Sequence, residues 1–335
     1  MKKILIAVIL ILAVIGTASA QDLRPIGRDI SALLEGLGED IAPYLQQTAL
    51  SGEGIGRASF GEDSRWFIAG SLGATFTGGI LTFIEPTNSN FETLNVYNVM
   101  TDTAGADLLG TLQSFFLLPS LRLSFGIRFP LGIETIFQGS FIPAALIGAI
   151  ANAAGLPDAA FGSLNLGFRA RKVIMEDSGG FPAVSLGVGY NFANTHGSVT
   201  IPDFNQDFGS YYLLLAGTLA FNTYVHTVGL DLGISKKLSI FYPFFKVSPY
   251  YQWTYYSGDI ENFNAGFYNS GTDAEIVTAA DQGIDPGAVV AISDLSLLLS
   301  AGFELVLGKF IIMPAASFDV GTAKFHANLA FRLHF

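Results

Sequence analysis

The chain has 335 residues, of which half are apolar and only 13% are charged, well below the quarter that soluble domains usually carry. Its mean hydropathy of +0.46 is unusual for a secreted globular protein. The formal net charge of -11 argues against nucleic acid as a partner, and the absence of cysteine excludes disulfides, thiolate chemistry and cysteine-based metal sites.

The first twenty residues have the pattern of a cleaved signal peptide. Lys2 and Lys3 precede an apolar run over 4–15, and 18–20 supply the small residues that a signal peptidase requires. The alternative is an uncleaved anchor, but the run is short for a spanning helix, which takes about 20 residues. We therefore expect export with cleavage, and a mature chain that begins at Gln21.

The next segment, 22–50, has helical periodicity. Its apolar residues fall near one face of a helix: Ile30, Leu33, Leu34, Leu37, Ile41 and Leu45. Asp29 or Ser31 could cap its start, and Gly36, Gly38 and Pro43 are expected to fray or kink it. The helix could plug a barrel or form a periplasmic cap. A polar, Gly-rich linker over 51–64 follows.

From Trp66 onward, apolar and polar residues alternate in segments of about ten, as in transmembrane β-barrels. The alternation predicts twelve strands, at 66–77, 108–117, 121–128, 131–141, 160–173, 181–193, 210–221, 223–236, 244–257, 294–307, 309–319 and 322–335. The second of these could equally begin as a helix. Two more strands are possible if 91–99 contributes, which gives twelve to fourteen.

The final strand, 322–335, has the clearest pattern. One face carries Phe325, Ala327, Leu329, Phe331, Leu333 and Phe335, and the other carries Lys324, His326, Asn328, Ala330, Arg332 and His334. One face suits lipid and the other suits water. Phe331, Leu333 and Phe335 at alternating positions resemble the sorting signal that outer-membrane barrels present to their assembly machinery.

An even number of strands places both ends of the barrel in the periplasm. The connections 78–107 and 258–293 then lie outside the cell. The connections 142–159 and 194–209 lie inside and are longer than a periplasmic turn should be, and 144–154 could form a short helix. The chain thus divides into a signal peptide over 1–20, a helix and linker over 21–64, and a barrel over 65–335.

Several short motifs between Tyr44 and Tyr256 carry a resemblance. They are the strand that opens at Trp66 after the Gly-rich linker, and the segments 119–126, 129–132 and 181–190. In this order they resemble an uncharacterised family of outer-membrane barrels with an N-terminal helix, distantly similar to the long-chain fatty-acid transporter (FadL-like) barrels. The resemblance implies an outer-membrane barrel of this size that moves hydrophobic molecules.

Alternation turns most charged side chains of the strands toward the lumen. The lumen-lining candidates are Arg122, Arg128, Arg169, Arg171, Glu134, Asp231, Lys246, Glu304, Asp319, Lys324 and Arg332, whereas Lys172 is expected near an interface. On the lipid face each such charge would cost about 2 to 4 kcal/mol near the midplane. These residues could form a salt-bridge network that fills the barrel, or a constriction that selects solutes by charge.

Enzymatic and metal chemistry find little support. The stretch 258–293 carries six carboxylates and no Lys or Arg, but without the spacing of a calcium loop, so a solvated acidic loop is the simpler reading. The four histidines, at 196, 226, 326 and 334, are scattered and have no serine motif near them. We expect no enzyme, no cofactor and no metal.

The sequence therefore predicts an all-β, monomeric outer-membrane barrel whose partners are lipid and the barrel assembly machinery. The leading hypothesis is passage of small hydrophobic or amphipathic solutes, which rests on the family resemblance. The alternatives are a general diffusion porin, and a structural or adhesive surface protein with a closed lumen. Inward Leu298 and Ala315 weigh against a wide aqueous pore.

Overall fold

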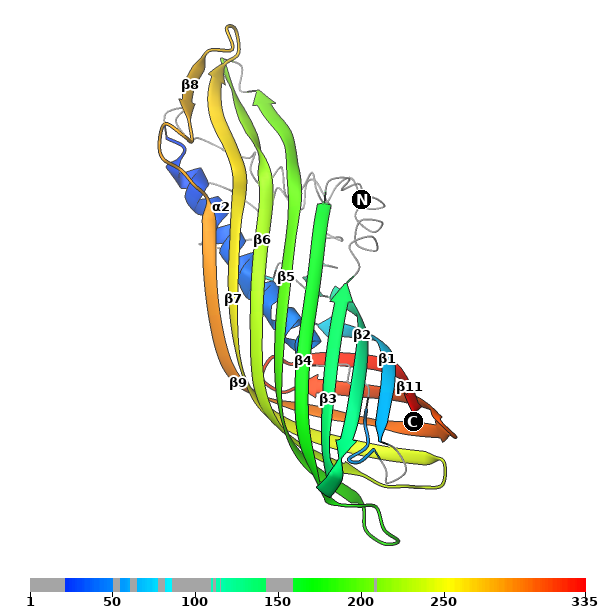
Figure 1. Ribbon diagram of the computed structural model, residues 1–335. Coiled ribbons are helices and arrows are strands. Elements are labelled where there is room, and N and C mark those ends of the chain that lie inside the picture. The colour runs from blue at the N-terminus through cyan, green and yellow to red at the C-terminus, as the bar shows by residue number, and fades with distance from the viewer. Residues whose placement is uncertain are drawn as a thin grey trace.

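A computed structural model describes residues 22–50, 55–60, 65–77, 82–85, 110, 113–114, 116–142, 159–207 and 210–335. It consists of one long helix and an antiparallel sheet that closes on itself (Figure 1). Within these residues, no helix combines the length and the apolar character needed to cross a bilayer.

The strands are β1 (Trp66–Thr77), β2 (Phe116–Phe129), β3 (Ile133–Ile142), β4 (Ala159–Met175), β5 (Ala183–Asp207), β6 (Tyr211–Ser235), β7 (Phe241–Asn269), β8 (Glu275–Thr278), β9 (Gly287–Leu307), β10 (Phe310–Asp319) and β11 (Lys324–His334). Consecutive strands pair in order from β1 to β7, β7 pairs with β9, and β11 pairs back with β1. The ring is therefore a closed barrel of ten strands, and β8 pairs with β7 outside it.

The strand count is thus ten rather than the predicted twelve to fourteen. The segments 210–221 and 223–236 form the single strand β6, and β2 begins at Phe116, with residues 110 and 113–114 helical instead of extended. In a ring where every strand already has two neighbours, no further strand can enter. Residues 91–99 and 144–154, where a strand pair and a short helix were considered, lie outside the described residues.

The barrel is inside out relative to a soluble protein. Along β11 the side chains alternate as predicted, with Phe325, Leu329, Phe331 and Leu333 about 40% exposed and the residues between them mostly buried. The large exposed side chains are apolar on nearly every strand of the ring, while charged side chains lie inside. This arrangement suits a barrel whose outer surface contacts hydrocarbon.

The strands are very unequal in length. The strands β5, β6 and β7 have 25, 25 and 29 residues, whereas β3 and β10 have 10 each. Figure 1 shows that these three long strands extend past the other strands, and together with β9 they form what we call the tall wall. On β5 the outward residues change from apolar to polar after Phe192, and the strand continues to Asp207, roughly 50 Å further as extended chain.

The two ends of the barrel differ in their connections. At one end, which we call the short-turn rim, Trp66 pairs with Phe335, and the connections 130–132, 176–182, 236–240 and 308–309 join the strands. The opposite end, the long-loop rim, carries the connections 78–115, 143–158 and 270–286. The stretch 142–159 therefore lies at the opposite end from the one predicted. The predicted connection 194–209 is mostly β5, and the predicted loop 258–293 is mostly β7, β8 and β9.

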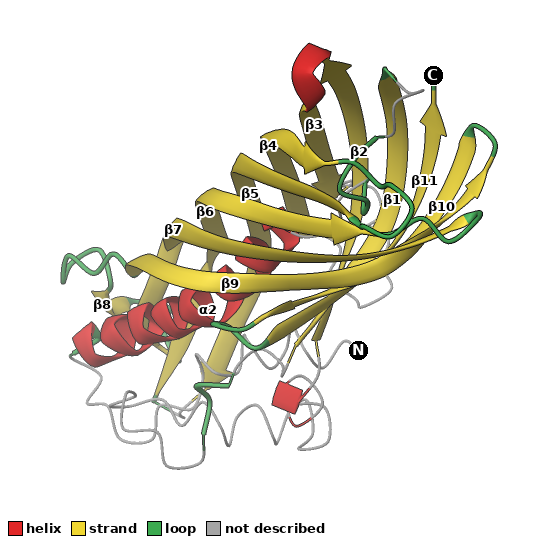
Figure 2. Ribbon diagram, turned by 90° about the horizontal axis from the view of Figure 1, so that it is seen from below, coloured by secondary structure: helices red, strands yellow, loops and turns green. Residues whose placement is uncertain are grey.

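The predicted helix forms α2 (Arg24–Leu50), which lies along the tall wall, inside the curve of the sheet (Figure 2). It starts before both predicted caps and continues through Gly36, Gly38 and Pro43 without a break. Pro43 has no N–H to offer the carbonyl of Glu39, but Glu39 is exposed, so water can bind that carbonyl. Gly36 and Gly38 lie against the rings of Phe83 and Tyr256, where a side chain would clash.

Candidate functional site in the barrel lumen

The predicted lumen residues all lie in the barrel interior. The side chains of Glu134, Glu304 and Asp319 are 0% exposed, and those of Arg122 and Arg332 are 1 to 2% exposed. The remaining members are buried or partly buried: Arg128, Arg169, Arg171, Asp231, Lys246 and Lys324. Lys172 is exposed, and its ammonium group donates to the carbonyl of Leu131 in a turn of the short-turn rim.

A short irregular segment lies in the lumen beyond the end of α2. It comprises residues Ile55–Phe60, all six of which are buried, and we call it the strap. Its backbone bonds to side chains of the barrel wall instead of to other backbone. Ala58 N–H donates to the hydroxyl of Ser235 (3.0 Å), and the carbonyl of Ile55 accepts from Lys246 Nζ (2.9 Å).

Glu304 on β9 is the main anchor of the strap. Its Oε1 atom accepts from the backbone N–H of Gly56 (2.8 Å) and of Arg57 (3.0 Å), and its carboxylate pairs with Arg57 Nε (2.7 Å). Arg332 on β11 binds the same carboxylate in a two-pronged contact, with NH1 at 3.0 Å from Oε1. A fully buried carboxylate is stable only with such partners, so the strap and the wall depend on each other.

Glu134 on β3 is the second anchor. Its Oε1 accepts from Phe60 N–H (2.8 Å), and its Oε2 lies 2.7 Å from both Nε and NH2 of Arg171. Arg128 NH1 lies 3.5 Å away and also donates to Ser59 Oγ (3.0 Å). Arg171 in turn donates to the carbonyl of Arg57 (2.8 Å). The two anchors therefore hold both ends of the strap.

The end of α2 is held by polar contacts to the wall. Arg122 NH2 donates to the carbonyl of Thr48 (2.7 Å), which places a cation at the negative end of the helix. The hydroxyl of Thr48 bonds to Thr75 (3.0 Å), and Thr75 bonds to Nδ1 of His326 (3.0 Å). Gln46 donates to Thr254 on β7 (2.5 Å). The helix thus ends inside the barrel, and does not cap it from the short-turn rim.

Other inward charges belong to the wall itself. Asp231 pairs with Arg169 Nε (2.7 Å) and accepts from Ser248 Oγ (2.6 Å). Asp319 accepts from the hydroxyls of Tyr250 and Ser296 and from the backbone N–H of Gly321 (3.0 Å). Lys324 Nζ lies 4.5 Å from the ring centre of Tyr44 on α2. The geometry is that of a charge network that fills the lumen.

The strap adjoins a small cavity and a larger vestibule. Between Leu50 and Ile55, at the junction of α2 and the strap, a cavity of about 20 Å³ remains, which is room for about one water. A vestibule of about 590 Å³ opens at the short-turn rim, with Arg57, Ser59 and Phe60 of the strap as its inner end. The strap therefore separates the vestibule from the rest of the lumen.

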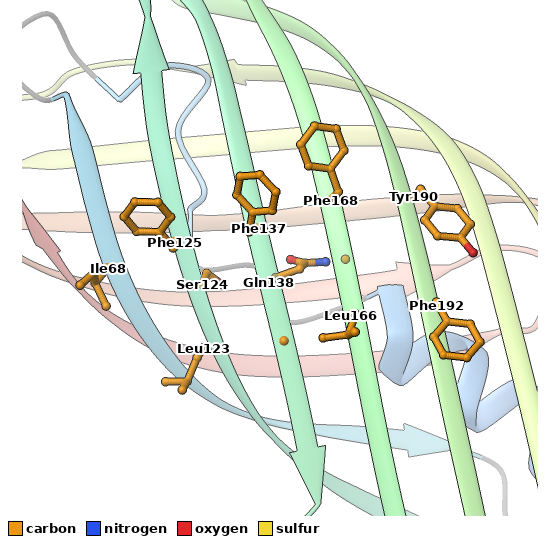
Figure 3. Close-up of a pocket in the computed structure, with 12 residues that line it drawn as sticks. Ile68, Leu123, Ser124, Phe125, Phe137, Gln138, Leu166, Phe168, Tyr190 and Phe192 are labelled. Carbon is orange, nitrogen blue, oxygen red and sulfur yellow. The ribbon is translucent and has the colours of Figure 1, made fainter.

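A further hollow lies on the outer surface, not in the lumen. It measures about 830 Å³ and spans β1 to β5 (Figure 3). Exposed side chains such as Leu123, Phe137 and Leu166 line it, and Gly139 pairs with both Leu123 and Leu166 without an outward side chain of its own. The hollow is an unevenness of the apolar outer face, so it gives no route across the membrane.

The histidines do not converge on a site. His226 stacks on Trp253 (5.2 Å between ring centres) and bonds to Tyr190 OH (2.8 Å), whereas His334 stacks on Phe67. His326 contacts Thr75, and His196 lies apart on β5. Among the described residues no group of three or more potential metal ligands is found.

The strap is the feature that sequence reasoning missed. Residues 51–64 were interpreted as a linker because they are polar and rich in glycine. One signal was available: Ile55, Arg57 and Phe60 are unusual in a solvated linker. Which backbone N–H groups meet which carboxylates follows only from the closed ring.

Comparisons with known proteins give a likeness of architecture. No family model matches the chain, and no curated protein matches it. The solved structures that it resembles are outer-membrane β-barrels, FadL-like transporters among them. It is similar to the outer membrane protease OmpT from Escherichia coli, at 9% identity and a TM-score of 0.40 over 82% of this chain and 98% of that chain.

Two further likenesses are more distant. The translocator domain of the autotransporter NalP from Neisseria meningitidis is 7% identical, with a TM-score of 0.34 over 81% of this chain and 88% of that chain. The CymD monoaromatic hydrocarbon channel is 8% identical, with a TM-score of 0.25 over 97% of each chain. At these values no residue role or activity is transferred from any of them.

Proposed function

We propose that the protein is an outer-membrane barrel with a permanently closed lumen, which acts through the wall that it presents outside the cell. The strap carries this proposal, because its N–H groups and Arg57 satisfy Glu304 and Glu134, which are both fully buried. Withdrawing the strap would remove Arg57 and two backbone N–H donors from Glu304, and one backbone N–H donor from Glu134, in a buried interior where lost hydrogen bonds are costly. This favours the structural or adhesive surface role over a diffusion porin.

The orientation follows from the connections. Outer-membrane barrels have short periplasmic turns and longer extracellular loops, so the short-turn rim would face the periplasm. The tall wall and α2 would then project from the cell surface. The outward row on β5 from Val184 to Phe192 marks a hydrocarbon band of the usual height for a tilted strand, about ten residues.

Conductance of the refolded protein in a planar bilayer tests the closed lumen. A heat-modifiability gel confirms that the barrel has formed, and we expect no conductance steps. A second readout uses Ser317→Cys, at the cavity between α2 and the strap, in a chain that has no other cysteine. We expect a water-soluble thiol reagent to leave it unmodified. Steady conductance, or rapid modification of this cysteine, would contradict the proposal.

Passage of small hydrophobic or amphipathic solutes is the second candidate, and the vestibule favours it. Lys237 and Lys309 line it, and neither ammonium group has a carboxylate partner among the described residues. Apolar side chains such as Val306 and Ile311 lie beside them. An amphipathic anion would suit this lining. Uptake of decanoate into vesicles that contain the barrel, reduced in a Lys237→Ala, Lys309→Ala double variant, would support passage.

We also propose export with cleavage after Ala20 and insertion as a monomer by the barrel assembly machinery. Support for insertion comes from the outward Phe331, Leu333 and Phe335, each 40 to 45% exposed, at the seam where β11 meets β1. Phe335 stacks on Trp66, with ring centres 4.1 Å apart. Deleting Phe335 should sharply reduce the amount of folded barrel in the outer membrane, and normal assembly would contradict this assignment.

A further inference from the structure

The segment that closes the barrel runs through it from end to end. α2 begins at the long-loop rim, where Leu23 N–H donates to Gln282 Oε1 (2.8 Å). Gly27 lies directly against Ile284, so closely that a Cβ at this position would be 2.4 Å from Ile284 Cγ2. Both contacts are with the connection between β8 and β9, at the top of the tall wall.

The other end of the segment lies at the opposite rim. Leu50 packs on Tyr250 and Leu298 within the barrel, and the strap continues below it. The chain then reaches Arg65, whose N–H donates to the carbonyl of Phe335 (3.0 Å) at the short-turn rim. The described parts of this segment, residues 22–50, 55–60 and Arg65, therefore lie in order from one mouth of the barrel to the other.

The segment is enclosed rather than inserted into an open mouth. On the side away from the tall wall, Asp40 accepts from the N–H and the hydroxyl of Thr82 (both 2.7 Å), and Phe83 covers Gly36. The helix is thus held between residues 82–85 and the wall. A helix in this position cannot enter after the ring and these contacts have closed, so it must be in place when they form.

From this path we propose that the barrel carries its own N-terminal segment across the outer membrane, and that the start of α2 is displayed on the cell surface. Asp22 and Arg24 form the exposed start, joined by an ion pair of 2.9 Å in which their side chains are 40% and 66% exposed. Surface display of α2 is a separate claim from closure of the lumen. A segment that entered the barrel from the periplasmic side would close it equally well, without reaching the cell surface.

The absence of cysteine makes the test direct. Single cysteines are introduced by Arg24→Cys at the start of α2, by Thr272→Cys in the turn before β8, and by Gly180→Cys in the turn 176–182. All three positions are exposed. Cells that express each variant are treated with a membrane-impermeant maleimide, first intact and then after the outer membrane is permeabilised. Heat-modifiability gels check that each barrel has folded.

We expect Arg24→Cys and Thr272→Cys to be labelled fully in intact cells, and Gly180→Cys only after permeabilisation. Labelling of Arg24→Cys together with Gly180→Cys would overturn the proposal, and so would its failure to react until the protein is denatured. If Arg24→Cys does not fold, Glu35→Cys, three turns further along α2 and also exposed, replaces it. Conductance measures the closed lumen separately, so either conclusion can fail without the other.

Discussion

The strap and α2 are held in the same barrel by different contacts. The strap has no regular secondary structure, and four of its N–H groups bond to Glu304, Ser235 and Glu134 on the wall. The helix satisfies its own backbone and packs apolar side chains, with Tyr44 and Leu45 against Ala193 and Val225.

The surroundings explain the difference. A helix satisfies most of its own backbone groups, so α2 can pack apolar side chains against the tall wall. Inside the ten-strand ring charged side chains occupy the interior, and the strap lies among them without a helix or strand ladder of its own. Its backbone N–H groups therefore need other acceptors, and the wall carboxylates supply them. The strap is thus held by polar backbone contacts in addition to the packing of Ile55 and Phe60.

The largest effect is expected from Glu304→Ala, which removes the main polar anchor of the strap. It removes the carboxylate shared by Arg57, Arg332 and two strap N–H groups, so the free energy of unfolding should fall by about 3 to 5 kcal/mol. Urea unfolding in lipid vesicles, followed by tryptophan fluorescence, measures it. Glu261→Ala on the exposed part of β7 is the control and should change little. Equal stability of the two variants would mean that the strap is not anchored as described.

The substitution Leu45→Ala tests the apolar packing of α2 against the tall wall. Leu45 is 4% exposed and packs against β5 and β6, so the lost contacts and the remaining cavity should cost about 3 kcal/mol. Leu238→Ala, at an exposed position of the turn 236–240, provides the matched control. The same urea series applies. A loss below about 0.5 kcal/mol would show that α2 rests on the wall without contributing to stability.

Close packing of the helix predicts a smaller effect for Gly38→Val. Its Cβ would lie 2.4 Å from the ring of Tyr256, which is itself buried, so helix and wall must separate at a cost of about 2 kcal/mol. Gly180→Val has open space around it and serves as the control. The temperature at which the heat-modifiability gel shows unfolding reports the difference. No shift would mean that the helix approaches β7 less closely than described.

The smallest effect is expected from Ser235→Ala, which removes one strap bond and leaves Ala58 N–H unpaired. The cost should be about 1 kcal/mol, well below that of Glu304→Ala, because only a neutral contact is lost. Hydrogen exchange at Ala58 should also become faster. Exchange equal to that of the unchanged protein would indicate that another acceptor replaces the hydroxyl.

The limits of sequence reasoning show in the long strands. The predicted ends at 193, 221 and 257 on β5, β6 and β7 fall where outward residues turn polar, yet each strand continues. Asn222 has the character of a turn residue, but in β6 it bonds to the hydroxyl of Tyr224 on the outer face. Alternation therefore marks the hydrocarbon band and not the length of the strand, because a strand that leaves the membrane needs no apolar side.

The sequence by itself determined the barrel, the inward charges and the helix, because alternation and helical periodicity are local properties that burial imposes on every strand and turn. The tertiary structure alone decided the number of strands, the position of α2 along the tall wall and the anchoring of the strap in the lumen. Those depend on which strand meets which and on contacts such as Phe60 with Glu134, 74 residues apart in the chain. No local pattern encodes such pairings, since a carboxylate that faces inward looks the same whether it binds an arginine, a backbone N–H or water.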